Sequence, residues 1–63
     1  MISEEMLREL ERFLKREIEA RDTYEDILKK IKNKEIRERL SYIRDDEVKH
    51  IYLLKKAMED VMA

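Results

Sequence analysis

The chain has 63 residues, of which 49% are charged and 43% apolar, and it contains no Gly, Pro or Cys. This length holds one small domain, and the absence of Cys excludes disulfide frameworks, thiolate zinc sites and iron–sulfur clusters. The formal charge of −1 provides no basic excess for nucleic acid, and the apolar runs are far shorter than a membrane span. We therefore expect a soluble, cytoplasmic protein with no nucleic-acid or membrane partner, stabilised by oligomerisation, a metal, or both.

Helix-forming residues dominate the composition, and the one visible break is the segment Lys32-Asn33-Lys34. Ser3 is a suitable N-cap for a first helix over about 3–32. Asn33 tolerates the left-handed conformation that ends many helices, so it is the predicted turn. A second helix is predicted over about 35–61. Because a short connection makes long helices antiparallel neighbours, the predicted fold is an all-α helical hairpin.

A heptad pattern of apolar residues runs along both predicted helices and defines the contact stripe through which they pack. A flanking apolar stripe lies beside it, as a bundle helix requires. In the first helix the contact stripe is Leu7, Leu10, Leu14, Glu17, Arg21, Tyr24, Leu28 and Ile31, flanked by Met6, Phe13, Ala20 and Ile27. In the second helix it is Ile36, Leu40, Ile43, Glu47, His50, Leu54, Ala57 and Val61, flanked by Ile51 and Met58.

A single domain of this kind, covering residues 1–63, leaves its flanking stripes exposed. Two hairpins packed together cover these stripes and complete a four-helix bundle, so we expect at least a homodimer. Tyr42, Val48 and Tyr52 fall on the outer surface of the second helix. They are either contacts in a higher even-numbered oligomer or ordinary exposed apolar residues.

Polar residues interrupt both contact stripes at one depth of the hairpin. Glu17 lies sixteen residues before Asn33, whereas Glu47 and His50 lie fourteen and seventeen residues after it. Glu and His three residues apart share a helical face, and a carboxylate in an apolar seam is costly unless it is paired or binds a metal. Two copies supply the carboxylate and imidazole set of bundle di-metal sites, which suits Fe or Mn better than structural Zn.

Two other interpretations of these residues stay open. The Glu and His side chains also suit a hydrogen-bonded polar layer that sets the register of the helices, and Arg21 is placed to neutralise Glu17 without a metal. Tyr24 lies two turns after Glu17. It is either a hydrogen-bond donor to a metal ligand or an ordinary core aromatic.

Two segments, Glu17-Ile18-Glu19-Ala20-Arg21-Asp22-Thr23-Tyr24 and Asp46-Glu47-Val48-Lys49-His50, resemble one half of a ferritin-like di-iron protein. The E-x-x-A-x-x-x-Y and E-x-x-H spacings are similar to those of rubrerythrin-type domains. The length and single repeat are most similar to encapsulated ferritin-like proteins, whose two-helix protomers build a di-iron ferroxidase centre across a dimer interface. The resemblance extends from about Leu7 to Leu54 and is specific only in the combination of its motifs.

This resemblance implies that Glu17, Glu47 and His50 bind two iron ions per dimer, with Mn or Zn as substitutes, and that Tyr24 lies beside the centre. It also implies secondary iron-binding positions at Glu19 and Asp22, and a location inside an encapsulin nanocompartment.

Some features differ from the family. No extension resembling a targeting peptide follows Ala63, which argues against association with an encapsulin shell. The absence of Cys argues against the rubredoxin-type site of full rubrerythrins. A designed two-helix metal-binding protein would share the ligand pattern.

The leading functional hypothesis is a ferroxidase that oxidises Fe(II) to Fe(III) with O₂ at a site shared by two chains, for iron storage or detoxification. One alternative is a non-enzymatic hairpin that serves for dimerisation or as a scaffold, with a buried polar layer. Another is a metal-stabilised bundle without turnover.

Overall fold

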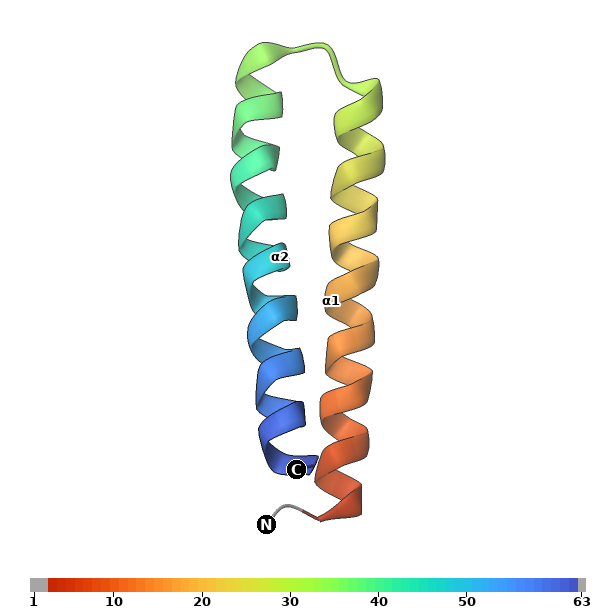
Figure 1. Cartoon of the computed structure of the whole chain (residues 1–63). Coiled ribbons are helices and arrows are strands. Elements are labelled where there is room, and N and C mark those ends of the chain that lie inside the picture. The colour runs from red at the N-terminus through yellow and green to blue at the C-terminus, as the bar shows by residue number, and fades with distance from the viewer. Residues whose placement is uncertain (1–2, 63) are drawn as a thin grey trace.

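A computed structural model describes residues 3–62, which form two α-helices joined by a short connection. Helix α1 spans Glu4–Lys30 and helix α2 spans Lys34–Met62. The helices lie side by side and antiparallel in a rod with dimensions of 47 × 15 × 12 Å, and α1 begins at the end of the rod where α2 ends (Figure 1). The predicted all-α hairpin is confirmed. Neither helix is long and apolar enough over the described residues to cross a membrane.

The start of α1 follows the predicted capping. The backbone N–H of Met6 donates to the Oγ of Ser3 at 3.2 Å, and Glu4 and Glu5 occupy the first turn. The Ser3 oxygen satisfies a donor that has no partner within the helix, and the two acidic residues complement the positive end of the helix dipole. The boundary therefore arises from local side-chain chemistry.

The prediction of a left-handed cap at Asn33 is wrong. Helix α1 ends at Lys30, followed by Ile31 in an extended conformation, and no residue among 3–62 has a positive φ. Asn33 instead begins α2, because its Oδ1 accepts from the Ile36 N–H at 3.0 Å and its carbonyl accepts from the Arg37 N–H at 2.9 Å. Asn suits a helix N-cap at least as well as a C-terminal turn, and here the N-cap is the role adopted.

The C-terminal end of α1 is closed by a side chain from α2. Arg37 Nη1 donates to the carbonyl oxygens of Leu28 and Ile31, the second at 3.0 Å. Carbonyls in the last turn of a helix lack intrahelical donors and carry partial negative charge. A guanidinium supplies both the hydrogen-bond donors and a compensating positive charge. Arg37 thereby ties the two helices together beside the connection.

We expect Asn33→Ala to lower the free energy of unfolding by about 1 kcal/mol, because the Ile36 N–H loses its acceptor. Asn33→Asp retains the acceptor and should stay within a few tenths of wild type. Urea unfolding followed by circular dichroism measures both. Equal stability of the Ala and wild-type proteins would contradict the N-cap role.

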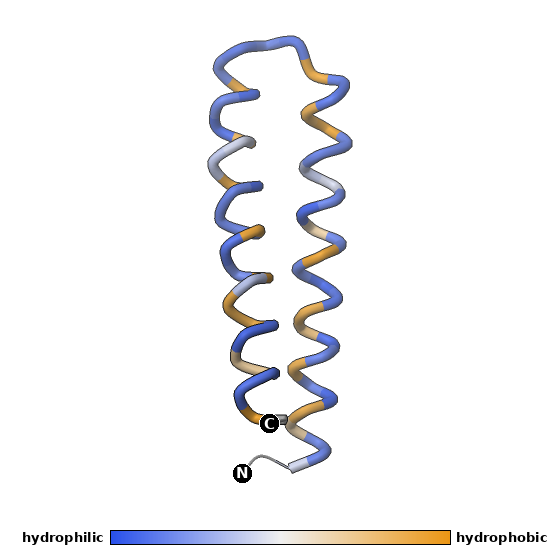
Figure 2. Tube along the Cα trace, in the orientation of Figure 1, coloured by the Kyte–Doolittle hydropathy of each residue, from blue (hydrophilic) through white to orange (hydrophobic). Residues whose placement is uncertain are grey.

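The contact stripe of α1 is where the heptad pattern predicts it. All eight predicted positions are buried or half-buried, and Leu28 is the most buried, with 7% of its surface exposed. Within the flanking stripe Met6, Phe13 and Ile27 are exposed, and Ala20 is half-buried. Figure 2 shows apolar segments recurring at regular intervals along both helices, as this packing requires.

The contact stripe of α2 differs from the prediction at most positions. Five of the eight predicted positions are exposed, namely Ile36, Ile43, His50, Ala57 and Val61. The residues that follow Ile43, His50 and Ala57 are buried or half-buried against α1 instead. Ile51, predicted to flank the stripe, is the most buried residue of α2, with 5% of its surface exposed. The observed stripe, buried or half-buried throughout, is Leu40, Arg44, Glu47, Ile51, Leu54 and Met58.

Apolar area explains this rotation of α2. Ile51 and Met58 together bury more apolar surface than His50 and Ala57 would, and burial free energy grows with apolar area. Arg44 is compatible with the stripe because its aliphatic stem covers apolar surface while its Nε reaches Asp45 at 2.8 Å. The exposed stripe of α2 therefore repeats every seven residues and includes His50.

Several exposed apolar residues of both helices lie on one side of the hairpin, which we call the open face, whereas the exposed Tyr42, Val48 and Tyr52 do not belong to it. Phe13 of α1 and His50 of α2 line the same groove, and the heptad spacing extends each stripe from there. The open face comprises Met6, Phe13, Ile27, Ile36, Ile43, His50, Leu53 and Ala57.

One copy of the hairpin has an incomplete core. Leu28 and Ile51 are its only buried apolar residues among those described. The exposed surface is 5434 Å², about 1,000 Å² more than the ~4,400 Å² of a compact monomer of this mass. The radius of gyration is 14.6 Å, against about 11 Å for a compact domain of this length. The chain thus exposes the apolar surface that a packing partner would cover.

Candidate metal centre

Three predicted ligands meet midway along the rod. Glu17 has thirteen residues of α1 on each side of it, and Glu47 and His50 come from the middle of α2. One potential ligand atom from each residue lies within 4.8 Å of the other two. The antiparallel register predicted from the turn therefore brings these side chains to one level. No other group of three such residues among 3–62 meets this criterion.

Both carboxylates of the centre have a buried oxygen without a hydrogen-bond partner. These are the Oε2 atoms of Glu17 and Glu47, and only 16% of the Glu17 side chain is exposed. A buried carboxylate oxygen without a donor carries a desolvation cost that native structures rarely leave unbalanced. Two such oxygens beside one imidazole require a cation or further donors. The donor set therefore fits a divalent metal ion.

The contact between Glu17 and His50 does not satisfy the site by itself. His50 Nδ1 lies 3.8 Å from Glu17 Oε2, which is beyond hydrogen-bond distance. Two ligand atoms about 2.1 Å from one ion lie at most about 4.2 Å apart. The 3.8 Å between His50 Nδ1 and Glu17 Oε2 is within this limit, and the outer bound of 4.8 Å for the three residues requires a small side-chain movement toward the ion. The spacing therefore suits ligation better than a direct hydrogen bond between the two side chains.

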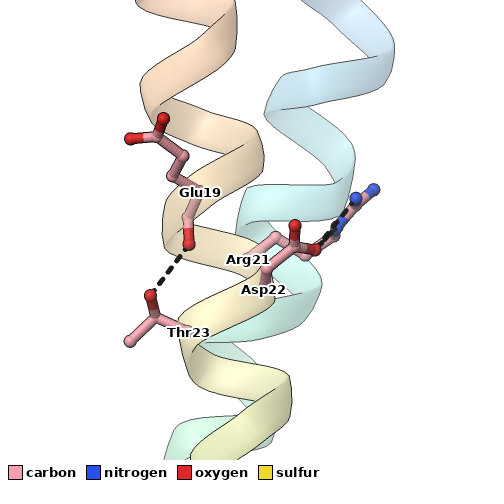
Figure 3. Close-up of polar contacts among 4 residues, drawn as sticks. All are labelled: Glu19, Arg21, Asp22 and Thr23. Atoms are coloured by element: carbon pink, nitrogen blue, oxygen red, sulfur yellow. Dashed lines mark hydrogen bonds and ion pairs between the residues drawn. The ribbon is translucent and has the colours of Figure 1, made fainter.

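Arg21 does not neutralise Glu17. Its Nε and Nη2 donate to Asp22 Oδ1 at 3.2 and 3.1 Å, as Figure 3 shows. The Arg21 guanidinium therefore neutralises the exposed carboxylate of Asp22, which lies outside the centre. The sequence-based alternative of a local Glu–Arg pair is therefore wrong for this conformation, and the charge of Glu17 is left for a ligand.

His50 lies at the edge of the centre. Its side chain is 54% exposed, because the rotation of α2 turns it out of the predicted contact stripe. It faces an open groove of about 350 Å³ together with Glu17, Phe13, Leu53 and Leu54. The centre therefore opens onto the open face. Leu53 was not predicted here, although it follows His50 by one helical turn.

The remaining predicted site residues take no part in this group. Tyr24 is half-buried and makes no side-chain hydrogen bond among residues 3–62. Asp22 is engaged by Arg21, and Glu19 points to a different side of α1, where its carbonyl accepts from Thr23 Oγ1 at 2.9 Å (Figure 3). The roles of Tyr24 beside the centre and of Glu19 and Asp22 as secondary iron positions stay predictions.

The chemistry of the three donors indicates which ions fit. Two carboxylates and one imidazole per chain carry a formal charge of −2 when His is neutral, which one divalent cation balances. Oxygen-rich ligation with one imidazole suits Fe(II) and Mn(II), and also accommodates Zn(II). Three protein donors leave coordination positions open for further ligands.

No protein-family model, curated protein or solved structure matches this chain. The functional assignment therefore depends on the geometry and chemistry of Glu17, Glu47 and His50.

Proposed function

We propose that two copies of the hairpin form a four-helix bundle with a di-iron ferroxidase centre at their interface. The observation that carries this proposal is the pair of buried, unpartnered carboxylate oxygens of Glu17 and Glu47 beside His50. The centre opens on the same side of the hairpin as the exposed apolar stripes. One packing event would therefore bury the apolar stripes and complete the ligand set.

The surface of the hairpin supports a second copy as the partner. Its excess of about 1,000 Å² over a compact monomer is close to the roughly 800 Å² per partner that a standard stable interface buries. The exposed apolar residues follow heptad spacing on both helices, which is the pattern of helix–helix packing. A two-fold arrangement places the same stripes of both copies against each other.

Charge balance supports two metal ions in this dimer. Two copies of the centre contribute four carboxylates and two imidazoles, and four negative charges match two divalent cations. A Glu from each of two helices and Glu-x-x-His from each of the other two form the ligand set of bundle di-metal carboxylate sites. Two irons, as substrate, would be held close together with positions open for O₂.

The proposed reaction converts two Fe(II) to two Fe(III). Each iron gives up one electron, and O₂ takes two electrons and two protons to leave as hydrogen peroxide. Glu17 and Glu47 favour the product because anionic oxygen donors in a partly buried site stabilise the higher charge of Fe(III). The ferric product would pass to a store that this small bundle does not itself enclose.

Aerobic mixing of the protein with two Fe(II) per dimer tests this proposal. We expect ferric absorbance in the near ultraviolet to develop faster than in buffer, and preloading with Zn(II) should block the reaction by occupying the ligands. Iron binding with oxidation at the buffer rate would instead establish a metal-stabilised bundle without turnover. Failure to bind any metal would favour the scaffold or dimerisation module.

A further inference from the structure

A second hollow lies closer to the connection between the helices and has a different character from the metal centre. It has a volume of about 260 Å³ and is lined by Glu25, Leu28, Lys29, Arg37 and Arg44. Each residue turns a helix by 100°. Glu25 and Arg44 each come one residue after a position that lies nearer the open face, so both lie on the opposite edge of the contact stripes. A second hairpin packed on the open face would therefore leave this hollow accessible.

Positive charge is concentrated around this hollow. Lys29, Arg37 and Arg44 face one carboxylate of the lining, that of Glu25. None of the ion pairs among residues 3–62 includes Glu25, Lys29 or Arg37. Arg44 is paired with Asp45 at 2.8 Å, so Lys29 and Arg37 exceed the charge of Glu25 by one positive charge. The lining therefore suits an anionic ligand.

Both guanidinium groups are held in place by contacts that leave other donors free. The carbonyl oxygens of Leu28 and Ile31 hold Arg37 Nη1, so Nη2 and Nε have no partner among the described residues. Asp45 holds Arg44 at Nε with a distance of 2.8 Å, which leaves both Nη atoms free, and 31% of the Arg44 side chain is exposed. Guanidinium groups ordered in advance bind oxyanions with a smaller loss of conformational entropy.

We propose that this hollow binds a phosphoryl dianion through Arg37, Arg44 and Lys29. Two guanidinium groups from α2 and an ammonium from α1 supply charge-assisted hydrogen bonds to a tetrahedral oxyanion, and the volume admits one such group. Leu28, buried at the base, limits access of water on one side. None of these residues belongs to the metal centre, so this site does not depend on the proposed ferroxidase function.

Titration calorimetry with inorganic phosphate, on the metal-free full chain at constant ionic strength, tests the proposal. Lys29→Gln combined with Arg44→Gln should weaken binding about tenfold or more, because charge-assisted hydrogen bonds are lost. Glu25→Gln should strengthen binding, because a like charge leaves the hollow. The matched control is Arg39→Gln on α2, whose side chain is 78% exposed and lies 3.9 Å from Glu35. Arg37 is kept, because it also caps α1.

Nuclear magnetic resonance of the arginine Nε groups locates the ligand. We expect phosphate to shift Arg37 and Arg44 and to leave Arg39 unchanged. Equal losses of affinity in the Arg39→Gln protein and the double variant, or weaker binding in Glu25→Gln, would overturn the proposal. Glycerol phosphate, titrated in parallel, distinguishes the sources: comparable affinity assigns a phosphoryl group on a larger molecule, and weaker binding assigns free phosphate.

Discussion

In the Glu47→Gln protein, Fe(II), Mn(II) or Zn(II) is expected to leave the melting temperature unchanged, whereas the wild type gains roughly 10–20 °C. A metal that binds only the folded dimer at about 100 times its dissociation constant stabilises it by about 2.7 kcal/mol. For a domain of this size each kcal/mol corresponds to roughly 4–8 °C. Gln keeps the shape of Glu47 but loses the charge that balances the ion. Differential scanning calorimetry with and without metal measures the effect.

Without metal, Glu47→Gln is expected to be more stable than the wild type. The unpartnered Oε2 of Glu47 is buried in the apo protein, and replacing the carboxylate with a neutral amide reduces its desolvation cost. Apo Glu47→Gln should therefore be about 1–3 kcal/mol more stable than apo wild type. The control is Glu38→Gln at an exposed position of α2, which should change the stability of neither the apo nor the metal-bound protein. Equal melting of the wild type with and without metal would contradict the ligand assignment.

Ile43→Glu is expected to convert the proposed dimer to a monomer, whereas Tyr42→Glu should leave it intact. These neighbours lie on different sides of α2: Ile43 belongs to the open face, and Tyr42, 69% exposed, points to the outer surface. Two symmetry-related carboxylates buried in the interface each cost several kcal/mol. A total of about 4 kcal/mol already raises the dissociation constant about a thousandfold.

Sedimentation equilibrium at micromolar concentration measures this difference. The wild type and Tyr42→Glu should show twice the chain mass of 7.8 kDa, and Ile43→Glu should show the chain mass itself. Metal affinity should fall together with dimerisation, because one hairpin would supply only half of the proposed ligand set. A monomeric wild type, or loss of the dimer in Tyr42→Glu alone, would contradict the assignment of the open face.

The helices and the level of the candidate site were predictable from local and periodic signals. In α1 only one set of heptad positions provides a long apolar contact stripe, so the heptad pattern determines which side of the helix is buried. The meeting of Glu17, Glu47 and His50 requires only a short antiparallel connection, because sixteen residues before Asn33 and fourteen to seventeen after it correspond to nearly equal distances along the rod.

The rotation of α2 was not predictable in the same way. The predicted stripe has Ile43, His50 and Ala57 where the adjacent, observed stripe has Arg44, Ile51 and Met58. Each set has two apolar residues and one polar residue, so both satisfy the heptad pattern almost equally. The choice between them depends on how much area each buries against α1, which is a tertiary property. The role of Asn33 was ambiguous because Asn serves both ends of helices, and the Arg37 contact joins a side chain to carbonyls nine and six residues earlier.

The position of the ligands halfway along the rod affects the direction in which two hairpins can associate. A centre near one end would meet its symmetry mate only if both rods pointed the same way. A centre at the midpoint lies level with its symmetry mate whether the two hairpins are parallel or antiparallel. Metal ligation in the proposed dimer would therefore not select between these two orientations. The relative orientation of the two hairpins would instead depend on the shapes of the side chains on either side of the centre, such as Phe13 toward one end and Ile27 toward the other.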